Sequence, residues 1–286
     1  MTDAIPLPGR ARVLDVIPVK RRRRRWSGSS GKAADIRERL EELAFRNGFS
    51  DLGVVAPEIP REDRERFRRW LAQGRHGEME YMARRVEHRL EFEDWVKSLI
   101  VLTRPYPPLR FPKGKKRYAA YAEGEDYHKT IRRALLPLAE EIRAAGGRAR
   151  RFVDTSSVLE RSLAARAGLG FIGRSTMLLS RTHGPYVFLC GIKTDLVLPP
   201  DSPGTGTCGE CRRCIETCPG NALDEEGLDS RKCVSYLTIE LKRPRTLEEE
   251  RLVGEWEFGC DVCIEVCPYA KFALPPVVPR RRGVER

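Results

Sequence analysis

Apolar residues recur with helical spacing in four stretches of the chain, and short apolar runs lie between these stretches. The first stretch begins at Lys32. There Ile36, Leu40 and Leu43 share one face, and Gly48 follows where a C-terminal cap would end the helix. Three further helices are predicted: one around Phe67, Trp70 and Leu71 that ends near Gly74, one over Asp126 to Ala145, and one over Ser157 to Ala167 with Ser157 and Glu160 in capping-box spacing.

The apolar runs between these helices predict buried strands. The clearest is Ser98 to Thr103, which prolines at positions 105, 107 and 108 would stop. Tyr186 to Leu189 and Ile192 to Leu198 have the pattern of two paired strands. Shorter runs at Leu52 to Val55 and at Phe152-Val153 complete the set. Because helices and strands alternate up to about residue 200, the sequence predicts an α/β or α+β first domain.

Composition divides the chain into four regions. Residues 1–30 contain Lys20 and the run Arg21 to Arg25 without any apolar period, which predicts a flexible basic arm, or alternatively a solvated tail with no role. Residues 31–200 form the predicted α/β domain, residues 201–275 a cysteine-rich domain, and residues 276–286 a basic tail.

Charge and hydropathy restrict the classes of protein to which this chain can belong. Of the 286 residues, 41% are hydrophobic and 33% are charged, which is typical of a globular protein. Apolar runs stay well short of the roughly 20 residues that cross a bilayer, and the N-terminus lacks the pattern of a secretory signal, so we expect a cytoplasmic protein. The net charge of +12 favours a polyanionic partner, and nucleic acid before an acidic metabolite.

Cysteine spacing carries the strongest chemical signal. Eight of the nine cysteines lie between Cys208 and Cys267, in a chain without an export signal, which favours metal ligation over disulfides. The run Cys208-x-x-Cys211-x-x-Cys214-x-x-x-Cys218-Pro219 has the spacing of a bacterial-ferredoxin cluster motif. A shortened copy, Cys260-x-x-Cys263-x-x-x-Cys267-Pro268, lacks one thiolate that Cys233 can supply.

In the ferredoxin pattern the last cysteine of each run ligates the other cluster, so the eight thiolates divide into two crossed sets. A pair of structural zinc sites is the alternative, although zinc requires no such crossed run. Cys190 lies in an apolar strand and is interpreted as a buried thiol. The first predicted set is Cys208, Cys211, Cys214 and Cys267; the second is Cys218, Cys233, Cys260 and Cys263.

Gly168-Leu169-Gly170-Phe171-Ile172-Gly173 matches the GxGxxG fingerprint of dinucleotide-binding folds, and Asp195 follows Gly173 by 22 residues. In that fingerprint a strand precedes the glycines and a helix follows them. Here the predicted helix comes first. The glycines are therefore interpreted as a helix stop and a close backbone turn, with nicotinamide or flavin binding as the alternative.

One acidic residue stands at a position where catalysis is possible. Asp154 lies between a predicted strand and a predicted helix, where a carboxyl group can face a cleft. The alternative is that Asp154, Thr155 or Ser156 simply caps the helix. Tyr127 and His128 open another helix near Tyr118 and Tyr121 and could line the same pocket, but spacing alone assigns no role to His76, His88, His128 or His183.

In combination, these motifs resemble the epoxyqueuosine reductases, a family of cobalamin-dependent iron–sulfur enzymes of tRNA modification. The resemblance covers roughly residues 32–272. Its matching stretches are His76 to Met82 (HGEMEYM), Gly124 to Lys129 (GEDYHK), Asp154 to Gly173 (DTSSVLERSLAARAGLGFIG), the cysteine run, Cys233 to Glu240 (CVSYLTIE) and Phe258 to Asp261 (FGCD).

The resemblance implies an α/β (α+β) cobalamin-binding domain followed by a ferredoxin-like module with two 4Fe–4S clusters. Base-off cobalamin would lie between these parts and be reduced by the clusters, and the substrate would be epoxyqueuosine at the wobble position of tRNA. Asp154 occupies the position of the proton donor that protonates the departing oxygen. The implied cobalamin contacts are Tyr121, Tyr127, His128, Asp154, Arg161, Leu178 and Leu189.

The implied partners are the anticodon stem-loop of tRNA and an external electron donor, with no membrane and a monomeric chain. The basic arm could add salt-sensitive affinity for the phosphates. Three rival functions stay open at this point: a corrinoid reductase of a small halogenated or epoxide compound, a ferredoxin-type electron carrier, and a zinc-stabilised nucleic-acid binder.

Overall fold

The structure, a computed structural model, describes residues 32–111, 114–275 and 277. The predicted basic arm therefore lies outside the described residues, as does the predicted basic tail apart from Val277. Within the described ranges, no helix combines the length and apolar character that a membrane crossing requires.

A four-stranded antiparallel sheet forms the centre of the first domain. Its spatial order is β1 (Asp51–Val55), β2 (Ser98–Pro105), β7 (Val187–Thr194) and β4 (Ala149–Val153). All eight residues of β2 are buried, because this strand has a neighbour on each edge and helices over both faces. The antiparallel pairing identifies the domain as α+β.

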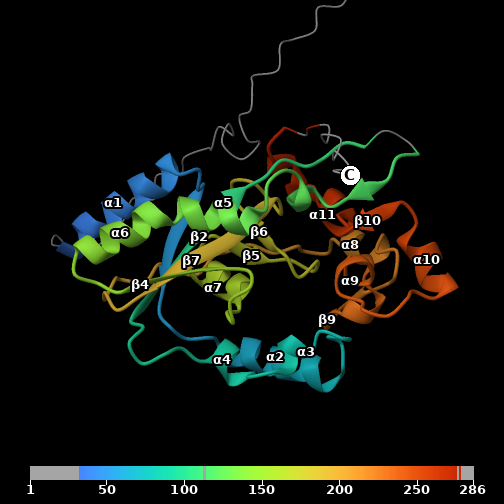
Figure 1. The fold of residues 1–286 in the computed structure, drawn as a ribbon, viewed down its shortest axis with the longest axis horizontal. Helices are drawn as coiled ribbons and strands as arrows, with labels where there is room; N and C mark the ends of the chain where they lie inside the picture. Colours follow the sequence, from blue (N-terminus) through green and yellow to red (C-terminus); the bar gives the residue numbers. More distant parts are fainter. Residues whose placement is uncertain (1–31, 112–113, 276, 278–286) are drawn as a thin grey trace, which may run out of the picture.

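Successive residues of β2 point to opposite faces of the sheet, and each face has its own core. Ile100 and Leu102 pack with helices α1 (Lys32–Arg46), α5 (Tyr127–Ala134) and α6 (Leu136–Ala144). Leu99 and Val101 pack with α7 (Glu160–Arg166) on the other side. Figure 1 shows the resulting layers, with α1, α6 and α5 above the sheet and α7 below it.

Two predicted elements differ from the observed ones. The single helix expected over Asp126 to Ala145 is divided into α5 and α6 at Leu135, because Pro137 in the first turn of α6 cannot donate the hydrogen bond that would continue α5. The two paired strands expected at Tyr186 to Leu189 and Ile192 to Leu198 are one continuous strand, β7. Gly191 does not turn the chain there; it leaves room for Phe152, whose ring atom Cζ would lie 2.4 Å from an added Cβ.

The predicted capping box at Ser157 and Glu160 is also wrong. Helix α7 begins at Glu160, and no side chain caps its N-terminus. The glycines after α7 act as the sequence predicted: Gly168 has a φ of +72° at the helix end, and β5 (Gly170–Ile172) follows and pairs with β6 (Leu178–Ser180). Strand follows helix, the reverse of a dinucleotide fingerprint, and Asp195 accepts a hydrogen bond from the Arg148 N–H at 2.7 Å.

The cysteine-rich part lies at one end of the molecule, beside the edge of the sheet (Figure 1). Its central core is small, with Val234, Tyr236 and Trp256 among its buried residues. Its elements are α8 (Arg213–Glu216), β8 (Leu223–Asp224), β9 (Gly227–Leu228), η3 (Ser230–Lys232), α9 (Val234–Ile239), α10 (Leu247–Val253), β10 (Trp256–Phe258), α11 (Val262–Glu265) and η4 (Pro268–Phe272).

One attachment between the two parts is a short parallel pairing of β3 (Arg117–Tyr118) with β10. Next to it, the Ala120 N–H donates to Asp261 Oδ2 at 2.6 Å, and Arg117 forms an ion pair with Glu265 at 2.6 Å. The Arg117 guanidinium also lies over the Trp256 ring, 4.2 Å from its centroid. Backbone pairing and a buried carboxyl together fix this side of the interface.

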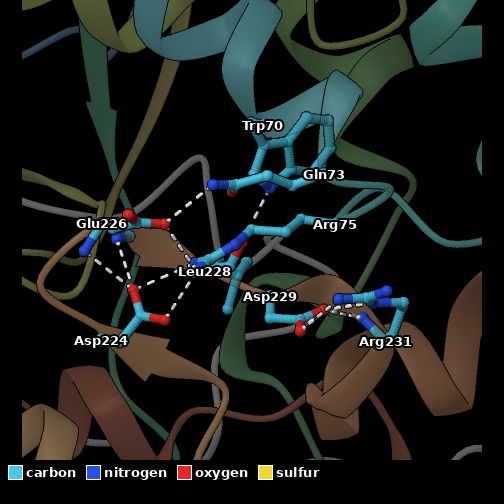
Figure 2. Close-up of polar contacts among 9 residues, drawn as sticks. Trp70, Gln73, Arg75, Asp224, Glu226, Leu228, Asp229 and Arg231 are labelled. Atoms are coloured by element: carbon cyan, nitrogen blue, oxygen red, sulfur yellow. Dashed lines mark hydrogen bonds and ion pairs between the residues drawn. The ribbon is translucent and has the colours of Figure 1, made fainter.

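A second attachment joins helix α2 (Arg61–Ala72) and the residues after it to the β8–β9 hairpin, as Figure 2 shows. Arg75 Nη2 lies 2.9 Å from carboxylate oxygens of both Asp224 and Glu226. The Trp70 indole N–H donates to the Leu228 carbonyl at 2.7 Å. Beyond this contact, α3 (Glu80–Ala83) and α4 (Glu87–Leu90) continue along the edge of the molecule (Figure 1).

Candidate active site and cluster sites

Asp154 lies directly after β4, which is an outer strand of the sheet. Its backbone is left-handed, with a φ of +46°, and its side chain is 58% exposed. The Tyr127 hydroxyl donates to Asp154 Oδ2 at 2.5 Å, and His128 Nε2 lies 3.0 Å from the same oxygen. The alternative that Asp154 caps the following helix is wrong, because α7 begins six residues later without a side-chain cap.

Asp126 fixes the orientation of His128. It is the N-cap residue of α5, and one carboxylate oxygen accepts the His128 main-chain N–H at 2.9 Å and contacts His128 Nδ1 at 2.8 Å. The hydrogen bond from His128 lowers the pKa of Asp126. An ionised Asp126 accepts a hydrogen bond from Nδ1–H and so turns Nε2 toward Asp154.

Aromatic rings pack around this contact. Tyr127 stacks on Phe188 of β7 with a centroid separation of 4.5 Å, and on His128 at 4.0 Å. Tyr121, in the 3₁₀ turn η2 (Ala120–Ala122), meets Tyr127 edge to face at 5.9 Å. Burial, and then the hydrogen bond to Asp154, raise the pKa of Tyr127 well above its usual range, so this phenol keeps its proton.

Glu160 and Arg161 lie on the inner side of Asp154. Glu160 Oε1 accepts the Asp154 main-chain N–H at 2.8 Å. Burial, together with the charge of Asp154, raises the pKa of Glu160 to about 8. Arg161 is reached by solvent, yet burial lowers its pKa. Asp154, Glu160 and Arg161 therefore form one group of charged side chains at the start of α7.

The remaining two predicted cofactor contacts have different surroundings. Leu178 is 2% exposed and belongs to the core below the sheet, so a contact with a ligand would come from its backbone. Leu189 is half-buried at the end of β7 and packs against that same core. Their role as cobalamin contacts stays a prediction.

Charge interactions between the eight clustered thiols link them in two groups with the membership of the two expected sets, and their role as cluster ligands stays a prediction. In the first set, burial raises the pKa of Cys214, as do the charges of Cys208 and Cys267. Burial likewise raises the pKa of Cys267, which also lies near Cys208 and Cys211. The last cysteine of the second run therefore joins the first three cysteines of the first run.

The thiols of the second set are more strongly affected by burial. Burial raises the pKa of Cys260 to about 12, and the charges of Cys233 and Cys218 add to this shift. The pKa of Cys263 is raised further, by burial and by Cys260, Cys233 and Cys218. We call the set with Cys208, Cys211, Cys214 and Cys267 the outer set, and the set with Cys218, Cys233, Cys260 and Cys263 the inner set.

The spacing and surroundings of the thiols fit a cluster better than a single ion. Within residues 32–111, 114–275 and 277, no three His, Cys, Asp or Glu side chains come close enough to hold one metal ion. Tetrahedral zinc needs four ligands at about 2.0–2.3 Å from one centre, whereas an iron–sulfur cubane takes thiolates that are further apart. Main-chain N–H groups of Arg174 and Ala222 lie 3.4 Å and 3.3 Å from the sulfurs of Cys208 and Cys218.

The inner set lies next to the acidic site. The charges of Glu160, Cys263 and Asp154 all act on Arg161 and raise its pKa against the effect of burial. Tyr121 likewise lies near Asp261 of the cysteine loop and near Asp154. Asp154 and Cys263 of the inner set therefore both lie near Arg161.

Sequence reasoning missed three residues of this site: Asp126, Glu160 and Phe188. Asp126 precedes the Tyr127-His128 pair as a typical N-cap, and that position could have indicated its contact with the imidazole. The spacing of Glu160 from Ser157 predicts a capping box instead. Phe188 gave no local signal, because its contact with Tyr127 depends on how β7 packs against α5. Cys190 is fully buried, as predicted for a lone thiol outside the clusters.

Two family profiles match the chain. The profile described as epoxyqueuosine reductase QueG, DUF1730, matches residues 87–155, which end just after Asp154. The profile described as a 4Fe–4S double cluster binding domain matches residues 207–270 and includes all eight clustered cysteines.

Individual proteins agree with these profiles. The chain is 39% identical over 245 residues to an epoxyqueuosine reductase of Cellulophaga algicola, covering 82% of this chain and 79% of that protein. A crystal structure of epoxyqueuosine reductase with an epoxyqueuosine-modified tRNA-Tyr stem loop matches with 26% identity and a TM-score of 0.78, covering 85% of this chain and 67% of that one. A reductive dehalogenase described as B12-dependent has 19% identity, a TM-score of 0.51 and coverage of 86% and 37%, and so shares the fold alone.

Proposed function

Since the chain belongs to the epoxyqueuosine reductase family, we propose that it reduces epoxyqueuosine to queuosine at the wobble position of tRNA. The reaction consumes two electrons and two protons and releases the epoxide oxygen as water. The observation that carries the proposal is the placement of Asp154, in contact with Tyr127 and His128 and near Arg161, which Cys263 of the inner set also approaches.

The donor groups fit the cofactors that this reaction needs. Eight thiols in two crossed sets suit two 4Fe–4S clusters, and a corrin ring held near Arg161 would lie between Asp154 and the inner set. When bound, cobalamin would supply nucleophilic, reduced cobalt chemistry for opening an epoxide, and the clusters would supply the electrons. Tyr121, Tyr127, His128, Arg161, Leu178 and Leu189 are the residues that would hold the corrin beside Asp154.

Asp154 serves as the proton donor in this proposal. An alkoxide is a poor leaving group, so a carboxylic acid within reach of the epoxide oxygen lowers the barrier. Tyr127 orients the Asp154 carboxyl by donating to one of its oxygens. His128, whose Nδ1–H is held by Asp126, returns a proton to Asp154 through Nε2 between turnovers.

The charge distribution supports an RNA partner. Lys129, Arg132 and Arg133 follow the Tyr127-His128 pair on α5, and all three are exposed. Phosphates of an anticodon loop would meet these cations while the wobble base is splayed toward Asp154. The whole chain carries a net charge of +12, which favours the same partner. An external donor would deliver electrons to the outer set, whose surroundings face solvent.

The test is an anaerobic turnover experiment with the full chain loaded with iron, sulfide and cobalamin. The substrate is tRNA that carries epoxyqueuosine, a chemical reductant supplies electrons, and nucleosides are identified by mass spectrometry after digestion. We expect queuosine to form only when iron–sulfur clusters and cobalamin are both present. A fully loaded protein that binds this tRNA and forms no queuosine would refute the proposal.

A further inference from the structure

The loop that carries Asp154 is held from two sides. From the outer side, Tyr127 and His128 contact one oxygen of the Asp154 carboxyl group. From the inner side, Glu160 accepts the Asp154 main-chain N–H at 2.8 Å. Residues 154–159 between β4 and α7 have no regular secondary structure, so they lack a ladder of hydrogen bonds that would fix this backbone.

The backbone of Asp154 needs such support. A φ of +46° is a conformation that non-glycine residues adopt at a cost of about 1–3 kcal/mol, although aspartate tolerates it better than most. A hydrogen bond that holds the Asp154 N–H fixes this backbone conformation, and so fixes the direction in which the Asp154 side chain projects. Without that contact, the backbone of Asp154 can relax and take the carboxyl away from Tyr127 and His128.

The chemistry of Glu160 suits this contact. As the first residue of α7, an ionised Glu160 would be favoured by the helix dipole. Burial and the neighbouring Asp154 charge outweigh that effect and raise its pKa to about 8, so its carboxyl group is neutral at pH 7. A neutral carboxyl still accepts a hydrogen bond, and it adds no charge that would repel the Asp154 carboxylate.

We propose that Glu160 is a positioning residue that holds the Asp154 loop in its reactive conformation by accepting the Asp154 main-chain N–H. The inference rests on the proposed function, in which Asp154 is the proton donor. It assigns Glu160 no contact with the substrate and no transfer of a proton.

The first test measures hydrogen exchange of the loop in three variants of the holoenzyme. Glu160→Gln keeps an acceptor oxygen at the same reach and cannot ionise, Glu160→Met keeps the length without an acceptor, and Glu160→Asp keeps the acid but withdraws the oxygen. We expect the peptide containing Asp154 to exchange about tenfold faster in Glu160→Met and Glu160→Asp, and within about twofold of wild type in Glu160→Gln. Iron content and melting temperature show which variants are folded.

The second test separates positioning from a general structural role. A misplaced acid lowers kcat by about tenfold or more while KM for the modified tRNA stays within about twofold. We expect this pattern in Glu160→Met and Glu160→Asp, with the rate rescued in Glu160→Gln. Cobalamin affinity, measured by absorbance titration without substrate, should change little in all three.

A pH series provides a signature specific to this carboxyl. The groups that act on or near it are Asp154, Arg161, Tyr127 and Cys190. Because the folded-state pKa of Glu160 is about 8 against 4.5 ordinarily, its stabilising contribution is complete below the ordinary value and is lost as pH rises toward 8. The melting temperature of Glu160→Gln relative to wild type should therefore increase from about pH 6 to about pH 8.

The outcomes distinguish this inference from the proposed function. If wild-type protein forms no queuosine, the proposed function fails, while hydrogen exchange still tests the contact itself. If wild type is active but a folded Glu160→Met or Glu160→Asp exchanges and turns over as wild type does, Glu160 does not position the loop. Loss of activity in Glu160→Gln, with the loop still protected, would also overturn the inference because it would require the carboxylic acid itself.

Discussion

Each cysteine set consists of four thiols, but the two sets have different surroundings. Residues beside the outer set, such as Gly209, Glu210 and Arg212, are exposed. Beside the inner set, Asp261 and Ile264 are buried, whereas Pro219 and Lys232 are exposed. Burial produces the largest thiol pKa shifts among the clustered cysteines at Cys260 and Cys263 of the inner set.

From this difference we infer the direction in which electrons pass between the two sets. Among the described residues, the outer set has exposed neighbours on several of its cysteines that a protein donor could approach. Cys263 of the inner set and Asp154 both act on Arg161, so the inner set lies on the side of the proposed acid. We therefore expect separate tasks for two sites that look equivalent in the sequence: the outer set would accept electrons, and the inner set would pass them toward the corrin.

Loss of the inner set should have the largest effect. Cys260→Ser removes a half-buried ligand of the set nearer Arg161, and turnover should fall to background with any reductant, with about half of the iron lost. Iron quantification and single-turnover assays measure this. Substantial turnover with dithionite in this variant would contradict the assigned direction.

Replacing the acid should abolish chemistry while leaving both sets intact. Asp154→Asn removes the proton donor but keeps the shape of the side chain, and we expect kcat to fall by about 10²–10⁴-fold. Iron content, cobalamin binding and tRNA affinity should match wild type. A variant with full activity would exclude Asp154 as the acid. Altered cluster spectra would instead show that replacing Asp154 also disturbs the inner set.

Loss of the outer set should abolish turnover with a protein electron donor but only reduce it with a small chemical reductant. In Cys211→Ser, turnover with a protein electron donor should be lost, because the exposed cluster is the one such a donor can reach. With a small chemical reductant, a rate within about tenfold of wild type should survive, since small reductants reach buried centres by other routes. Equal loss with both reductants would mean that the outer set does more than accept electrons.

The β8–β9 hairpin offers a smaller test. Arg75→Ala removes two ion pairs, to Asp224 and Glu226, whose carboxylates are about half exposed (Figure 2). Such pairs contribute little each, so we expect stability to fall by about 1 kcal/mol, and by less at high salt. Thermal unfolding at two salt concentrations measures this. Gln73→Ala, which removes one hydrogen bond to Glu226, is the matched control and should have a smaller effect.

The ninth cysteine should give the smallest effect. Cys190 is fully buried in β7 and belongs to neither set. Cys190→Ala should leave the iron content unchanged and cost about 1 kcal/mol of stability from lost packing. A fall in iron content would show that a thiol outside the two sets supports a cluster.

Local spacing was sufficient for much of this protein. The CxxCxxCxxxCP run specifies two crossed ligand sets because the short separations between its cysteines restrict where each thiolate can reach. The apolar run at Leu99 to Leu102 identified a buried strand, since its side chains must fill both faces of a sheet. The helix stop at Gly168 was also predictable, because glycine accepts a positive φ without strain.

Only the tertiary structure decided the rest. Tyr127 and Asp154 are 27 residues apart, and their 2.5 Å contact exists because α5 packs beside β4. Likewise, the side chain of Glu160 could cap its own helix or accept the Asp154 N–H, and the irregular loop before α7 brings that N–H to it. Which cysteine set faces solvent also depends on how the cysteine-rich part docks on the sheet domain. Chain geometry fixes contacts a few residues apart, whereas distant partners meet only through packing of the whole fold.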